Sequence, residues 1–277
     1  MTSLLLSVGV CFCIQAYFFY IRDAGTGKTE SNYFSTFSRF QAGAKPAAEI
    51  ALAGSSITGR LPGREIGNQD IANLGSDGGS AMDGLRLITE GRIDPPSWLV
   101  IEVNTLYRAV CVGETLIYQG AQSPWFGVGA KQPLLGASAR PTGMLYAAIL
   151  RRPKVLVADG FKVTANDIVL PVDSSLDKFT EGEKNTFDSY LSQLQRLQNQ
   201  GVKIIIANYP AGEMTEREEF LMNTTLAELG KSIKFSYLDL RNQIPRQDLQ
   251  FTDPIHLAPE SAARVLQTIR NFCIENN

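Results

Sequence analysis

Short apolar runs that end in glycine or small polar residues recur along the chain and predict five strands. The runs are Glu49–Ala53, Asp70–Leu74, Trp98–Val103, Val202–Ala207 and Phe235–Leu240. The run at 202–207 is apolar throughout, which is typical of a parallel strand covered on both faces. Between and after the runs, helices are predicted at 80–90 and 215–229. Apolar residues at helical spacing also predict a helix through 187–197 that Gly201 closes, and a final helix whose inner stripe is 262–272.

Alternating strands and helices of this length predict right-handed crossovers and a three-layer α/β/α sandwich with a mainly parallel sheet. In such sheets the active site lies beyond the carboxyl ends of the strands. We therefore expect the polar and glycine-rich strand endings to gather at one edge.

The N-terminal part of the chain follows a different pattern. Leu4–Ile21 is nearly all apolar and long enough to span a bilayer, so residues 1–22 are predicted to be a membrane anchor. A buried core helix is the alternative interpretation. Arg22 and Lys28 follow the run, and by the positive-inside rule they weakly favour a cytoplasmic domain. Ala24–Thr29 resembles a phosphate-binding loop but lacks the first glycine, because Arg22 stands at that position.

Residues 23–46 are predicted to be a juxtamembrane linker with a short helix at 33–40, and residues 47–277 to form the α/β domain. Within that domain, 105–178 is longer than an ordinary connection. It is either a lid or insertion, or an extra helical layer.

Composition narrows the possible partners. The net charge of −2 gives no basic surface for nucleic acid. The four cysteines show no metal-binding spacing, so we expect no metal and no cofactor. Cys111 and Cys273 could pair in an oxidising compartment, although two buried thiols are the favoured state.

His256 is the only histidine of the chain and lies in Asp253-Pro254-Ile255-His256. Histidine titrates near neutral pH, and a carboxylate three residues away can hold its ring in one tautomer. This is the Asp–His half of a serine-type triad. A lone surface or capping histidine is the alternative, and a nucleophile elsewhere decides between them.

Four strand-end motifs, in this order, resemble the SGNH hydrolase superfamily of GDSL-like esterases and acyltransferases. They are Gly54-Ser55-Ser56-Ile57-Thr58, Asn73-Leu74-Gly75-Ser76-Asp77-Gly78, Glu102-Val103-Asn104 and Asp253-Pro254-Ile255-His256. The resemblance covers 47–277 and implies an SGNH/flavodoxin-like fold. The chain departs from the family pattern at Ser55, where the family has aspartate, and at Glu102, where it has glycine.

The resemblance also implies roles for individual residues. Ser56 would be the nucleophile, His256 its base and Asp253 the group that orients the histidine. The oxyanion hole would consist of the N–H groups of Ser56 and Gly78 and the side-chain amide of Asn104.

The implied function is an acyl ester hydrolase or O-acyltransferase that acts on acylated carbohydrate or cell-envelope glycan through an acyl-serine intermediate. The resemblance further implies an extracytoplasmic catalytic domain, tethered by its N-terminal helix, and a membrane-bound protein as acyl donor. Two alternatives stay open: an inactive SGNH-fold glycan-binding or scaffold protein, and a lipid acyl hydrolase.

Overall fold

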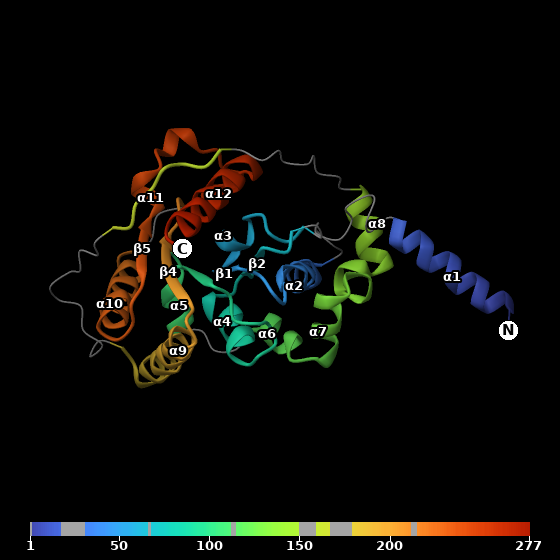
Figure 1. Cartoon of the computed structure of the whole chain (residues 1–277), viewed down its shortest axis with the longest axis horizontal. Coiled ribbons are helices and arrows are strands. Elements are labelled where there is room, and N and C mark those ends of the chain that lie inside the picture. Colours follow the sequence, from blue (N-terminus) through green and yellow to red (C-terminus); the bar gives the residue numbers. More distant parts are fainter. Residues whose placement is uncertain are drawn as a thin grey trace.

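A five-stranded parallel sheet forms the centre of the protein (Figure 1). The computed structural model describes residues 2–17, 31–65, 68–111, 115–149, 159–166, 179–211 and 215–277. The strands follow the order β2-β1-β3-β4-β5, as in flavodoxin-like doubly wound folds. They are β1 (Ile50–Gly54), β2 (Ile71–Gly75), β3 (Trp98–Glu102), β4 (Lys203–Asn208) and β5 (Ser236–Asp239). The predicted α/β class and all five predicted strands are confirmed.

Helices cover both faces of the sheet, which explains why β1, β2 and β3 are buried along their whole length. Alternate strand residues such as Ala51 and Ile206 face one helical layer, and their neighbours Leu52 and Ile205 face the other. The first layer contains α4 (Ala81–Thr89), α5 (Leu106–Cys111), α9 (Glu181–Asn199) and α10 (Glu216–Ser232). The second contains α3 (Ser56–Gly59), α11 (Leu240–Gln243) and α12 (Pro259–Glu275).

One predicted helix end is wrong. The helix that begins at 215–216 was expected to stop before Gly230, but α10 continues to Ser232. A glycine inside a helix costs only about 1 kcal/mol relative to alanine, so it weakens the helix without ending it. The C-cap residue is Ile233, whose N–H donates to the Leu229 carbonyl.

In the long segment after β3, the described residues up to Ile149 are mainly helical. After α5 come α6 (Leu116–Ala121), α7 (Pro124–Lys131), two short 3-10 helices, η2 (Pro133–Leu135) and η3 (Ala137–Ala139), and α8 (Pro141–Ile149). Residues 150–158 and 167–178 lie outside the described residues. Residues 159–166 end beside β5, where Asn166 pairs with Tyr237, and η5 (Arg246–Asp248) follows α11.

The stretch expected to be a linker contains a helix of the α/β body. This helix, α2 (Asn32–Gly43), includes the predicted 33–40 helix, and its Phe40 is fully buried in the core. Gln41 donates to the Phe126 carbonyl at 2.9 Å and accepts from the Ala137 N–H at 2.7 Å. The side chain of Gln41 therefore joins α2 to the layer formed by α7 and η3.

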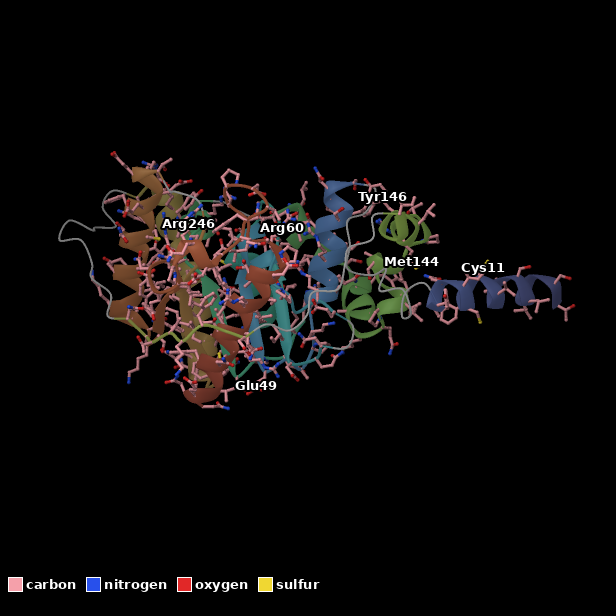
Figure 2. All side chains as sticks on the ribbon, turned by 90° about the horizontal axis from the view of Figure 1, so that it is seen from above. Cys11, Glu49, Arg60, Met144, Tyr146 and Arg246 are labelled. Atoms are coloured by element: carbon pink, nitrogen blue, oxygen red, sulfur yellow. The ribbon has the colours of Figure 1, made fainter. Side chains whose placement is uncertain are left out.

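The first helix, α1 (Thr2–Ala16), extends away from the body beside α8 (Figures 1 and 2). Its apolar side chains, such as Leu6 and Val8, are exposed, and Gln15 donates to the Ala139 carbonyl at 2.6 Å. None of the helices in the described ranges has both the length and the apolar character needed to cross a membrane. The end of the predicted anchor (18–21) and the phosphate-loop-like residues 24–29 lie outside those ranges.

Candidate active site

Ser56 lies where β1, an interior strand of the sheet, leads into α3. Strand β1 is buried throughout and ends at Gly54. Ser55 is the N-cap of α3, and its hydroxyl accepts the Ile57 N–H at 3.2 Å. Ser56 is therefore the first helical residue, half-buried at the carboxyl edge of the sheet.

His256 reaches Ser56 from the loop that precedes α12. Its Nε2 lies 2.8 Å from Ser56 Oγ, and its Nδ1 lies 2.8 and 3.0 Å from the two carboxylate oxygens of Asp253. The backbone closes the loop, because the Thr252 N–H donates to the His256 carbonyl at 2.9 Å. The three predicted side chains thus form one serine–histidine–aspartate chain, with each histidine nitrogen facing a different partner.

Asp253 is held in its charged form. Desolvation alone would raise its pKa, but hydrogen bonds from the His256 ring and from the N–H groups of Ile255 and His256 outweigh that effect. The pKa of Asp253 is lowered to about 2. The carboxylate is therefore charged at neutral pH and available as a hydrogen-bond acceptor for the ring Nδ1–H.

The two adjacent serines point to different partners. Ser55 is buried, and its hydroxyl donates to Glu102 Oε1 at 2.7 Å, whereas the hydroxyl of Ser56 meets the histidine. Glu102 lies at the end of β3 and is fully buried. The two departures from the family pattern are thus hydrogen-bonded to each other, a relationship that the sequence analysis did not foresee.

Gly78 lies in the turn after β2 with a φ of 73°, a conformation that favours glycine. It is exposed, and within the described ranges no acceptor is bonded to its N–H. Asp83 at the start of α4 stabilises the turn, because its carboxylate accepts a hydrogen bond from the Ser76 hydroxyl at 2.9 Å. Burial raises the pKa of Asp83.

Arg64 joins the turn that contains Ser56 to the turn that contains Gly78. It is fully buried and donates to the carbonyls of Gly59 at the end of α3 and Gly75 at the end of β2, the latter at 2.6 Å. Burial lowers the pKa of Arg64 to about 9. Beside the same turn, Asp77 is paired with Arg39.

The side-chain amide of Asn104 makes other contacts than its predicted role in the oxyanion hole requires. Its side chain is buried, and its amide donates to Asn208 Oδ1 at 3.2 Å and to the Tyr209 carbonyl at 3.0 Å. Its carbonyl oxygen accepts the Tyr209 N–H at 2.8 Å, which fixes the orientation of the amide. Both amide hydrogens therefore bind the end of β4 and the loop that follows it, not an open oxyanion site.

The arrangement has the parts that acyl transfer needs. A hydroxyl is in contact with a histidine, the histidine with a carboxylate, and two backbone N–H groups at 56 and 78 lack acceptors among the described residues. Comparisons of the chain with protein-family models, with curated proteins and with solved structures found no match.

Proposed function

We propose that the protein is a serine-dependent acyl ester hydrolase or O-acyltransferase of the SGNH type. The observation that carries the proposal is the hydrogen-bonded chain Ser56–His256–Asp253, with a 2.8 Å contact between hydroxyl and imidazole. A histidine that only caps a helix is not expected to contact a serine hydroxyl 200 residues away with one ring nitrogen and a carboxylate with the other.

The first half-reaction forms the acyl-serine. Ser56 Oγ bonds to the ester carbonyl carbon while its proton passes to His256 Nε2. The charge that develops on the carbonyl oxygen is stabilised by hydrogen bonds from the N–H groups of Ser56 and Gly78. When the ester C–O bond breaks, the leaving alcohol takes the proton from His256.

The second half-reaction regenerates the serine. Water or a sugar hydroxyl loses its proton to His256 Nε2 and attacks the acyl carbon, and Ser56 recovers its proton as it leaves. Asp253 stabilises the imidazolium in both halves. In this scheme Asn104 contributes to the oxyanion hole only if substrate exchanges one of its two present hydrogen bonds for the oxyanion.

The proposed substrate is an acylated glycan of the cell envelope, reached by a catalytic domain that is held at the outer face of a membrane. The exposed apolar side chains around α1 support the membrane contact, because a helix that is apolar on all sides is ordinarily buried in a protein core or in a membrane. In a transfer reaction a membrane-bound protein would deliver the acyl group. The same exposed helix favours a second candidate, a lipid acyl hydrolase, since it would hold the site near acyl chains.

The test is active-site labelling combined with a substrate series. The full chain, in detergent, is treated with a fluorophosphonate probe, and the labelled peptide is identified by mass spectrometry. We expect labelling at Ser56, and its loss in Ser56→Ala and His256→Ala. Turnover of acetylated oligosaccharides but not of phospholipids supports the glycan assignment, and the reverse supports the lipid hydrolase. An unlabelled wild-type protein that binds glycan without turnover would instead identify a binding module.

A further inference from the structure

We propose that Glu102 is a positioning residue. It holds the turn formed by residues 55–58, here called the nucleophile turn, in its reactive shape. Its carboxylate accepts five hydrogen bonds from three residues. Oε2 accepts from the N–H of Ser55 at 2.9 Å, and from the N–H and hydroxyl of Thr58 at 3.0 and 2.7 Å. Oε1 accepts from the hydroxyls of Ser55 at 2.7 Å and Thr105 at 2.5 Å.

These hydrogen bonds fix the residues on both sides of Ser56 but do not involve the N–H of Ser56 itself. The N–H groups of Ser55 and Thr58 bind Glu102, and that of Ile57 binds the Ser55 hydroxyl. Within the described part of the chain, no acceptor is bonded to the N–H of Ser56. The donor that remains is the one that the proposed function assigns to the oxyanion, and the inference rests on that function for its catalytic consequence.

The space around Glu102 is matched to it. A Cβ added at Gly54 would lie 2.5 Å from Glu102 Oε2 and 2.2 Å from Thr58 Oγ1. Only a glycine at the end of β1 therefore lets the carboxylate approach the turn. Glu102 is 0% exposed, and a buried carboxylate is tolerated only where donors replace its water. Four of its five donors belong to the nucleophile turn itself.

Glutamine offers a matched control, because it can reproduce the contacts without the charge. With its carbonyl oxygen in place of Oε2, it keeps both backbone N–H bonds. Its NH₂ group would then face the hydroxyls of Ser55 and Thr105, which can accept as well as donate. Alanine, in contrast, leaves the N–H groups of Ser55 and Thr58 buried without an acceptor, so the turn must shift or admit water.

The experiment compares Glu102→Ala, Glu102→Gln and Ile269→Ala in the full chain. Ile269 is fully buried in α12 and supplies a destabilised protein with an intact turn. At a temperature where all variants are folded, we expect Glu102→Ala to lower kcat by about 10²- to 10³-fold with little change in KM. Glu102→Gln should stay within about tenfold of wild type, and Ile269→Ala should keep its kcat.

Hydrogen–deuterium exchange of the peptide spanning 50–60 gives a readout that does not depend on activity. Relative to the amides of β4, the amides of Ser55 and Thr58 should exchange at least tenfold faster in Glu102→Ala than in wild type. In Glu102→Gln they should exchange as slowly as in wild type. Unchanged exchange in Glu102→Ala, or a Glu102→Gln protein as impaired as Glu102→Ala, would overturn the proposal. If wild type hydrolyses no ester but the exchange pattern is as expected, the proposed function fails and the positioning of the turn stands.

Discussion

The structure predicts that the adjacent serines have opposite effects when each is replaced by alanine. Ser56 is half-buried, and its hydroxyl contacts the part-exposed His256. Ser55 is 1% exposed, and its hydroxyl both caps α3 and binds Glu102. We therefore expect Ser56→Ala to lose activity and keep stability, and Ser55→Ala to lose stability and keep most of its activity.

The magnitudes follow from the contacts that are lost. Removing an N-cap costs about 1 kcal/mol, and losing a hydrogen bond to a charged group about 1.5–3 kcal/mol. Ser55→Ala should therefore lose roughly 2–4 kcal/mol, which for a domain of this size lowers the Tm by about 4–16 °C. Ser56→Ala should stay within about 0.5 kcal/mol of wild type.

For turnover the order of the two variants reverses, and Ser56→Ala is expected to lose more activity than Ser55→Ala. Removing the nucleophile of a triad lowers kcat by about 10⁶-fold. In Ser55→Ala four of the five donors to Glu102 remain, so the turn should keep its shape and kcat should fall roughly tenfold or less. Thermal unfolding and p-nitrophenyl acetate hydrolysis, measured on the same preparations, provide the test. An inactive Ser55→Ala beside an active Ser56→Ala would show that the nucleophile is one residue earlier.

Three further predictions concern other contacts. Gly54→Ala would place a methyl group 2.5 Å from Glu102 Oε2. We therefore expect the free energy of unfolding, measured in urea, to fall by about 1–3 kcal/mol together with a lower kcat. A variant as stable as wild type would contradict this. The pKa of Asp253 is lowered to about 2 from 3.8, so its stabilising contribution is complete above about pH 4 and disappears as the pH falls through 2. Asp253→Asn should therefore lose less stability than wild type between these values, and parallel curves of unfolding midpoint against pH would refute the sign. Burial raises the pKa of Cys273 to about 12, so iodoacetamide at pH 8 should modify exposed Cys11 well before Cys273, as peptide mass spectrometry would show.

The parts of the fold that depend on local pattern could be predicted from the sequence. Strands β1 and β2 come from short, mainly apolar runs that each end in glycine, and Gly54 and Gly75 end these neighbouring strands in register. The pairing of Ser56 with His256 is implied by the resemblance of the motifs to the SGNH superfamily, because His256 lies in the loop before α12 and not at the end of a strand. The start of α10 has a local signature too, the capping box of Thr215 and Glu218.

The partners of buried polar groups could not be predicted in the same way. Glu102 follows four apolar residues, and in the sequence it is only a departure from the glycine of the family motif. Its partners come from a turn 44–47 residues earlier, and only the pairing of β1 with β3 brings them together. Asn104 is a similar case, since its hydrogen bonds depend on how the chain leaves β4, 104 residues later.

The distance along the chain between Ser56 and His256 has a consequence for biosynthesis. At about 5–20 residues per second, the 200 residues that separate them take about 10–40 s to translate. During that interval β1 and its nucleophile turn exist without a base. In the proposed mechanism, the growing chain thus carries a serine without its base while the rest of the sheet is made. The reactivity that we propose for Ser56 would begin only when the loop before α12 docks, so completion of folding would itself activate the site.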